Sequence, residues 1–267
     1  MKEARPWGWT RDDAPDLNYS YVLHDSKEWL EHWHRGFGVQ DLGLGQASGG
    51  RFDAHRLRAM SGPGEGSDWP ARAFDFECVF VLNGCLELRG DSGFYAVLRR
   101  HDALLIPRQW RPAQFWYTGD FEGLEILAPG LNGLREEQAE AISQTQSPVV
   151  SMESSHAYRP AGDRSFFLYR DLGTESLTDG RIGLNLVRSN GVVEPGGTGR
   201  HRHSMAQWNL MISGWQDMDW MGQASRRMMP GDATCTPREL PHDVTAYSYD
   251  FAILNLTMPA KFSTSPV

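Results

Sequence analysis

Short apolar runs, separated by glycine, proline and aspartate, dominate the chain from about residue 40 onward. Three of them are "ECVFVLNG" (77–84), "IGLNLVRS" (182–189) and "FAILNLTMP" (251–259). Apolar runs of strand length that are bounded by turn residues are typical of an antiparallel sandwich or barrel. The sequence therefore predicts an all-β fold.

Helical patterns are scarce and lie in two places. The stretch "SKEWLEHWH" (26–34) has Ser26 as a candidate N-cap, and "LREEQAEAISQ" (134–144) is an acidic segment typical of a surface connector. We expect a short helical segment near the N-terminus and another in a linker between two halves of the chain.

The two halves can be superposed in sequence without a gap at one constant offset. At this offset Glu77 aligns with Gln207, and the stretch 101–112 aligns with 231–242. A repeat of this length indicates two copies of one β-domain, each of ordinary domain size. We expect an N-terminal extension (1–40), a first domain (41–130), a linker (131–160), a second domain (161–258) and a tail (259–267).

One group of polar residues in the second half has the spacing of a metal site. Side chains alternate between the two faces of a strand, so His201, His203 and Gln207 would point the same way. Polar groups inside a small barrel are costly unless they share a partner, and a divalent metal ion can be that partner. His242, from a later strand, would complete a set of three imidazoles and one amide that leaves one or two positions open for water or substrate.

These residues resemble the two sequence motifs of the cupin superfamily. The first motif is a glycine, five residues, His-x-His, three or four residues, Glu, six residues and Gly. The second is Gly, five residues, Pro-x-Gly, two residues and His. The positions that match are His201, His203, Gln207 and Gly214 in the first motif and Gly231, Pro237 and His242 in the second. The resemblance covers roughly residues 60 to 258 and implies two jelly-roll barrels in tandem, a metal-binding second barrel, a small-molecule substrate and a homodimer.

The chain departs from the family pattern at several positions. Pro195 stands at the opening glycine of the first motif, Glu239 at the inner glycine of the second, Ala246 at its closing Asn, and Gln207 at the Glu ligand. A neutral amide in place of a carboxylate leaves the full charge of a divalent ion on the centre, which favours an anionic oxygen as ligand. Two groups of the superfamily use a Gln ligand, the uronate-opening sugar proteins and the ureidoglycine aminohydrolases, and the ligand order here is similar to the first.

The first copy lacks most of the ligand set. Ala71, Ala73 and Pro112 stand at the three histidine positions, and Glu77 is the ligand-type residue that remains. A single carboxylate holds a transition metal poorly. We expect this barrel to be structural or dimerising, with a ligand-binding role left open.

The expected function is a metal-dependent enzyme acting on a small oxygenated substrate such as a hydroxy-acid, ketone or enol. Fe(II) is favoured because imidazole-rich sites with open positions suit iron and O2. The favoured interpretation is therefore a non-haem dioxygenase. Mn, Ni or Zn would instead suit an isomerase, lyase or hydrolase of a sugar acid or ureide. A non-catalytic small-molecule-binding protein is the third alternative, and the general base is unknown.

Other residues near the motifs have two interpretations each. Arg202 and Arg238 are candidate binders of a substrate carboxylate, although Arg202 alternates away from the ligand face. The neighbouring tryptophan and methionine side chains could line an aromatic pocket, but barrel core is the favoured interpretation. They are Trp208, Trp215, Trp220, Met211, Met218 and Met221.

Composition removes several classes of partner. The net charge of −8 and the absence of a Lys/Arg block argue against nucleic acid. The chain has three cysteines without CxxC spacing, which favours free thiols and a cytoplasmic location. No apolar stretch is long enough to predict a membrane span.

Overall fold

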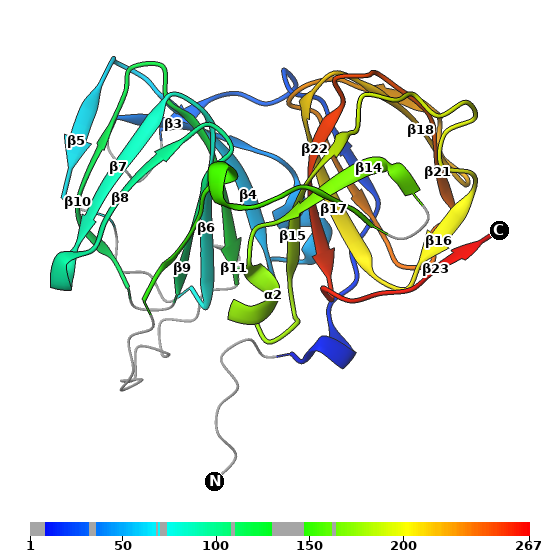
Figure 1. Cartoon of the computed structure of the whole chain (residues 1–267), viewed down its shortest axis with the longest axis horizontal. Helices are drawn as coiled ribbons and strands as arrows, with labels where there is room; N and C mark the ends of the chain where they lie inside the picture. The colour runs from blue at the N-terminus through cyan, green and yellow to red at the C-terminus, as the bar shows by residue number, and fades with distance from the viewer. Residues whose placement is uncertain are drawn as a thin grey trace, which may run out of the picture. The chain divides into compact units, whose positions relative to one another are not determined.

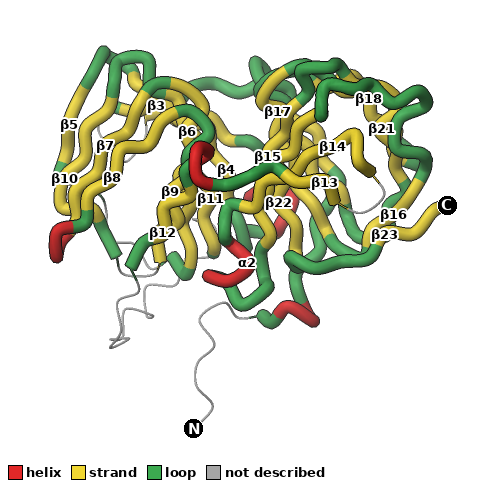
Figure 2. Tube along the Cα trace, viewed as in Figure 1, coloured by secondary structure: helices red, strands yellow, loops and turns green. Residues whose placement is uncertain are grey.

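The computed structural model describes residues 9–31, 36–67, 69, 74–107, 110–129, 147–161 and 164–267. Strands make up most of these residues, and the helices are short (Figures 1 and 2). The described residues form two compact units, one within Lys27–Ser155 and the other from residues 9–26 and His156–Val267. The all-β class predicted from the apolar runs is confirmed.

Unit 1 contains two antiparallel sheets. In its described residues the larger sheet has the order β12-β9-β6-β11-β4-β3-β2, and the smaller has the order β5-β10-β7-β8. The elements are β2 (Leu30–Glu31), β3 (Phe37–Asp41), α1 (Leu44–Ser48), β4 (Asp53–Ala59), β5 (Gly64–Gly66), β6 (Phe76–Asn83), β7 (Cys85–Gly90), β8 (Tyr95–Arg99), β9 (Ala103–Pro107), β10 (Pro112–Tyr117), β11 (Glu122–Ala128) and β12 (Val149–Ser151). Short 3₁₀ helices lie at Asp91–Gly93 and Glu153–Ser155.

Unit 2 repeats this arrangement. Its larger sheet has the order β1-β20-β17-β22-β15-β14-β13, and its smaller sheet has the order β19-β18-β21-β16-β23. The elements are a 3₁₀ helix (Arg11–Asp13), β1 (Ser20–Val22), β13 (Arg159–Ala161), β14 (Arg164–Asp171), α2 (Thr174–Leu177), β15 (Gly183–Ser189), β16 (His201–His203), β17 (Ala206–Ser213), β18 (Gln216–Trp220), β19 (Arg226–Met228), β20 (Ala233–Thr236), β21 (His242–Tyr247), β22 (Ala252–Met258) and β23 (Thr264–Pro266).

The offset that aligns Glu77 with Gln207 in the sequence recurs in the structure. It relates the first residues of β6 and β17, of β10 and β21, and of β11 and β22. The same offset relates β4 to β15 and α1 to α2, which lie outside the stretches that we aligned by sequence. The repeat therefore extends further toward the N-terminus of each copy than the motifs alone indicate.

The N-terminal segment belongs to the second copy, which differs from the boundaries that we expected. Strand β1 pairs with β20 through Ser20 and Cys235, just as β12 pairs with β9 through Val149 and Leu105 in unit 1. The edge strand of unit 2 therefore comes from residues that we assigned to an extension. Such a strand is too short to produce a periodic signal.

The helix expected over residues 26–34 is absent from the part of it that the structure describes. Residues 26–29 are irregular, and Leu30–Glu31 form β2, which pairs with β3 through Leu30 and Val39. Pairing with a neighbouring strand outweighs the local helix preference here. The second expected helix, 134–144, lies outside the described residues, as do the remaining positions 32–34.

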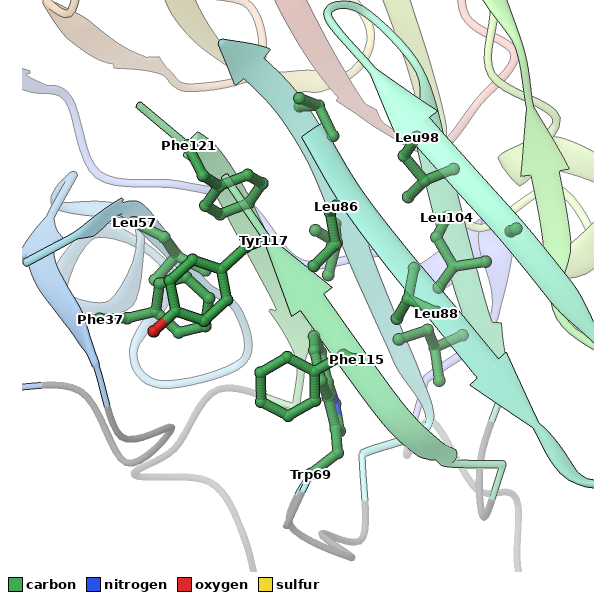
Figure 3. Packing of buried hydrophobic residues seen from close by; sticks show 14 of the residues in the cluster. Phe37, Leu57, Trp69, Leu86, Leu88, Leu98, Leu104, Phe115, Tyr117 and Phe121 are labelled. Carbon is green, nitrogen blue, oxygen red and sulfur yellow. The ribbon is translucent and has the colours of Figure 1, made fainter. Parts of the chain in front are cut away.

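Apolar side chains fill the interior of unit 1. The cluster takes residues from both sheets, and aromatic rings occupy one end of it (Figure 3). Its members include Phe37, Leu57, Trp69, Val79, Val81, Leu86, Leu88, Leu98, Leu104, Phe115, Tyr117 and Phe121. No helix in the described residues is long and apolar enough to cross a bilayer.

Candidate metal centre

Two neighbouring strands of unit 2 carry the three histidines. His201 and His203 lie at the two ends of β16, and His242 opens β21, where it pairs directly with His201. Both β16 histidines are buried, whereas Arg202 between them is exposed. The alternation of side chains expected from the sequence therefore holds at this strand.

The three imidazoles form one cluster. Their potential ligand atoms all lie within 4.8 Å of one another, and the ring centroids are 4.5 to 5.0 Å apart. His201, His203 and His242 are 4%, 8% and 3% exposed. Packing three polar rings this closely and out of water is costly unless a shared partner satisfies their nitrogens.

Hydrogen bonds fix the orientation of each ring. The Nδ1 of His201 donates to the Gly199 carbonyl at 2.7 Å, and the Nδ1 of His242 donates to the Leu240 carbonyl at 2.8 Å. A carbonyl only accepts, so in both neutral rings the lone pair is on Nε2. The Nδ1 of His203 lies 2.8 Å from the Thr264 hydroxyl, which can hold this ring in the same tautomer. This is the arrangement that metal-binding histidines have in proteins.

Gln207 reaches the cluster from β17. Its Nε2 donates to the Nε2 of His242 at 3.2 Å, while its Oε1 accepts from the Nδ2 of Asn255 at 3.4 Å. The same Nδ2 donates to the Oδ1 of Asn209 at 2.8 Å. A ligand role for Gln207 therefore requires its amide to turn so that Oε1 faces the imidazoles.

A cavity of about 560 Å³ opens beside the cluster. Its lining contains Arg200 but no Asp, Glu or Lys among the described residues. The other residues are Phe167, Tyr169, Val187, Thr198, Gly199, His201, His203, Met205, Gln207, Asn209, Gln216, Met218, His242, Val244, Phe251, Ile253, Asn255, Phe262, Thr264 and Pro266. Most of the wall is apolar, and its polar part consists mainly of imidazoles and amides.

The two candidate arginines do not line this cavity. Arg202 forms an ion pair with Glu239 at 3.2 Å, and both side chains are about half exposed. Arg238 contacts the N-terminal segment, because its backbone N–H donates to Asp16 and its guanidinium donates to the Ala14 carbonyl. Arg200 does line the cavity, with its guanidinium paired to Asp219.

The sequence did not indicate three side chains that contact the proposed ligands, Asn255, Thr264 and Phe262. Asn255 had a signal, because it is a polar side chain inside the apolar run 251–259. Thr264 and Phe262 come from the segment that we assigned to a tail, and the Phe262 ring lies 5.2 Å from that of His203. Strand β23 brings this segment back along β16, and nothing in its sequence indicates that pairing.

The tryptophans and methionines around the motifs divide between the two interpretations. Trp208 and Trp220 are fully buried, and the indole of Trp220 donates to Thr236 at 3.0 Å. Met218, by contrast, lines the cavity. Trp208 and Trp220 are therefore core residues, whereas Met218 also lines the pocket.

The equivalent end of unit 1 is filled by an indole. Trp69 donates from its Nε1 to the Oε1 of Glu77 at 3.0 Å, and its ring packs edge-on against Phe115 at 5.3 Å. Glu77, the ligand-type residue of this copy, is 3% exposed and has this indole as a partner. Pro112 opens β10 where His242 opens β21, and Ala71 and Ala73 lie outside the described residues.

Comparison with known proteins shows similarity in fold. No family profile and no curated protein sequence matches the chain. Among solved structures, the protein YlbA from E. coli is 10% identical with a TM-score of 0.66 and covers 91% of this chain and 92% of its own. The putative glyoxylate-induced protein from Pseudomonas aeruginosa is 14% identical with a TM-score of 0.67 (91% and 90%). The oxalate decarboxylase from Lactobacillus farciminis, solved as a formate complex, is 10% identical with a TM-score of 0.64 (94% and 88%).

Proposed function

We propose that this chain, which has two copies of the cupin fold, is a metal-dependent enzyme that acts on a small oxygenated organic substrate. The ligands would be His201, His203, His242 and Gln207, and the substrate would bind in the adjoining cavity. The observation that carries the proposal is the buried cluster of imidazoles whose Nδ1 atoms are already hydrogen-bonded.

The donor set fits a first-row divalent ion. Three neutral imidazoles and an amide oxygen suit Fe(II), Mn, Ni or Zn, with Fe(II) favoured for an imidazole-rich site with open positions. None of these four ligands carries a negative charge, so a bound ion would keep its full positive charge and attract an enolate, carboxylate or hydroxy-keto oxygen. Such an ion supplies Lewis acidity and, if it is iron, access to O2 chemistry.

The cavity lining bears on the type of reaction. Isomerisation through an enediol needs a side chain that takes a proton from carbon, and Asp, Glu and Lys are the usual choices besides His. Among the described residues the lining contains none of these three, and besides the proposed histidine ligands Tyr169 is the side chain of a type that can act as a base. A substrate that is already an enol or enolate in solution, such as an acidic 1,3-diketone, needs no proton removal from carbon in the site, so oxidation of such a substrate by O2 is the reaction class that we favour.

The second candidate function is a lyase. Several structurally similar proteins are oxalate decarboxylases, including those from Lactobacillus farciminis and Bacillus subtilis. Decarboxylation of a bound acid would likewise fit a site that holds an anion against a divalent ion. The same protein preparation tests both functions.

The first experiment is the metal content of protein purified without added metal, measured by elemental mass spectrometry. The expected result is about one equivalent of metal per chain, lost in a His201→Ala, His242→Ala double variant. The matched control is His156→Ala, because His156 is exposed and does not line the cavity.

The metal found then selects the activity assay. Iron leads to oxygen-consumption assays with hydroxy-acids and diketones, whereas manganese, nickel or zinc leads to decarboxylase, isomerase and hydrolase assays. Failure of the wild-type protein to hold any of these metals, even after reconstitution, would contradict the proposal. A metal-loaded protein without turnover would leave a binding protein instead of an enzyme.

A further inference from the structure

The strand register of unit 2 arranges the cavity side chains in successive rows. Gln207 in β17 is followed on the same face by Asn209, which pairs with Asn255 in β22. Two residues before Asn255 in β22, Ile253 pairs with Val187 of β15. Val187 pairs in turn with Tyr169 of β14. Because a strand rises about 3.3 Å per residue, neighbouring rows lie roughly 7 Å apart.

The row next to the imidazoles is polar and uncharged. Asn255 donates to both Asn209 and Gln207, so these three amides form one hydrogen-bonded chain at this level of the cavity. Amides both donate and accept, and they can therefore bind the oxygen atoms of a ligand without adding charge.

The rows beyond the amides are largely apolar. Ile253 and Val187 face the cavity together with Phe167, Phe251 and Met218. These residues belong to one apolar cluster of unit 2. Tyr169 and Gln216 are the polar side chains among the cavity residues at this end. A ligand that filled this region with hydroxyl or carboxylate groups would leave most of them without hydrogen-bond partners.

Cavity size points the same way. A two-carbon diacid would occupy little of about 560 Å³, which lies within the range of pockets that hold larger organic ligands. A sugar acid would fill more of the space, but its hydroxyl groups would face valine, isoleucine and phenylalanine side chains.

We infer that the substrate has a chelating pair of oxygens at one end and an apolar body, aromatic or branched aliphatic, at the other. The oxygens lie against the imidazoles and the amide row, and the apolar body lies against Ile253, Val187 and Phe251. This inference rests on the proposed metal centre, because the metal fixes the polar end.

Matched pairs of ligands test the inference on protein whose metal content is measured first. Pyruvate with phenylpyruvate, and acetylacetone with benzoylacetone, differ mainly in one phenyl ring. Binding is measured by calorimetry on zinc- or nickel-loaded protein without O2. We expect the phenyl member of each pair to bind at least about tenfold tighter, since its ring leaves water on binding, and oxalate to bind more weakly than phenylpyruvate.

A substitution that fills the apolar end gives the second arm of the test. Ile253→Trp should abolish the advantage of the phenyl ligands while leaving metal content and pyruvate affinity unchanged. The control is Val193→Trp, because Val193 is exposed and is not a cavity residue, and it should leave all affinities unchanged.

The outcomes separate the two proposals. Metal-loaded protein that binds both members of each pair equally, or that prefers oxalate, would overturn this inference and leave the metal centre intact. Protein that holds no metal would overturn the proposed function and, with it, the chelated end of the substrate. If Ile253→Trp also loses its metal, Val187→Thr replaces it, since it adds a hydroxyl at similar volume and should weaken only the phenyl ligands.

Discussion

Each imidazole of the cluster is held by a hydrogen bond at its Nδ1, and one of the three bonds comes from a side chain. The Thr264 hydroxyl is the Nδ1 partner of His203, whereas the Nδ1 atoms of His201 and His242 bond to backbone carbonyls. Only the Thr264 contact can therefore be removed without changing a ligand or the backbone.

Thr264→Val should weaken metal binding by about 10- to 100-fold, because the substitution removes the partner that orients the His203 ring. Competition with a chelator of known affinity measures the change. Thr264→Ser keeps a hydroxyl and should stay within a few-fold of the wild type. Equal affinities in the Val and Ser variants would contradict a positioning role for this hydroxyl.

Asn255 controls which atom of Gln207 can face the imidazoles. In the structure it donates to the Oε1 of Gln207, which directs the amide N–H toward His242. Asn255→Asp offers an acceptor to that amide, so it should hold Oε1 toward the imidazoles and keep or raise metal affinity. Asn255→Leu removes the contact and should lower metal affinity.

The measurement is again metal affinity, together with thermal unfolding of the metal-free proteins. Both variants change a buried polar side chain, so each can alter stability, but opposite effects on metal affinity would reflect the direction of the Gln207 amide. Equal losses in the two variants would contradict this role of Asn255.

The sequence grouped His201 and His203 by strand alternation, and it added Gln207 and His242 by the spacing of the cupin motifs. The structure places Gln207 on β17, so it does not share a strand with the two histidines as we expected. Metal binding by these residues stays a prediction. The contacts of Thr264 and Asn255 could not be predicted, since they depend on which strands become neighbours. The clearest missed signal is the single polar residue of the run 251–259.

In unit 1, a buried His–Glu pair stands where unit 2 has the amide side chain of Asn255. His55 of β4 lies directly opposite Glu125 of β11, with its Nδ1 3.3 Å from the carboxylate. Burial lowers the pKa of His55, but the hydrogen bond and charge of Glu125, with Asp53 and Asp41 nearby, outweigh it and raise the pKa above its usual value. Glu125 stands at the position of Asn255 in the second copy.

The raised pKa gives a sign to the pH dependence of stability. The folded pKa lies above the unfolded one, so the pair stabilises the fold fully below the unfolded pKa and loses this effect as the pH rises through the folded pKa. His55→Gln should therefore lower the free energy of unfolding more at about pH 5.5 than at about pH 9. Urea denaturation at both values tests this, and an equal loss at both would contradict it.

The indole of Trp69 takes the space at the end of the first barrel. Trp69→Ala should lower the free energy of unfolding by about 3 to 5 kcal/mol, because it leaves a void beside Phe115 and Glu77. Trp69→Phe keeps most of the packing but removes the indole donor to Glu77, which should cost about 1 to 3 kcal/mol. Denaturation curves measure both, and a smaller loss in the Ala variant than in the Phe variant would contradict the packing role.

At the level of elements, the sequence predicted the strands better than the helices or the strand edges. The apolar runs such as 77–84 and 251–259 became central strands, because burial on both sides of a sheet favours them. The stretch 26–34 has a helical pattern, yet in its described part residues 26–29 are irregular and Leu30–Glu31 pair with β3 as an edge strand. Very short strands such as β1 and β23 carry no periodic signal, so only the structure reveals them.

At the scale of the whole molecule, the sequence predicted the repeat, but it did not predict which copy each terminal strand belongs to. One constant offset in numbering relates most described elements of unit 1 to those of unit 2. Residues 9–26, however, complete the second copy although they precede the first. The carboxylate of Asp232 anchors them by accepting from the Tyr21 hydroxyl and the His24 backbone N–H, each at 2.9 Å.

A fragment of residues 156–267 should therefore be unable to fold stably by itself. It lacks β1, so one edge of β20 loses its partner, and the buried Asp232 loses two donors. Circular dichroism and amide-proton NMR spectra would report the defect, and adding a peptide of residues 8–26 should restore a folded complex. A fragment that folds equally well without the peptide would contradict this prediction.

Because β1 belongs to unit 2, the two units can be completed only at different times during protein synthesis. A ribosome makes β1 before any strand of unit 1. It makes β23, which begins with Thr264, the partner of His203, after every other strand described. All described strands of unit 1 are available while most of unit 2 is still untranslated. The barrel with the histidine cluster is complete only when β1 has paired with β20 and β23 has paired with β16, so a metal ion bound by the cluster would enter after the last of these strands has been made.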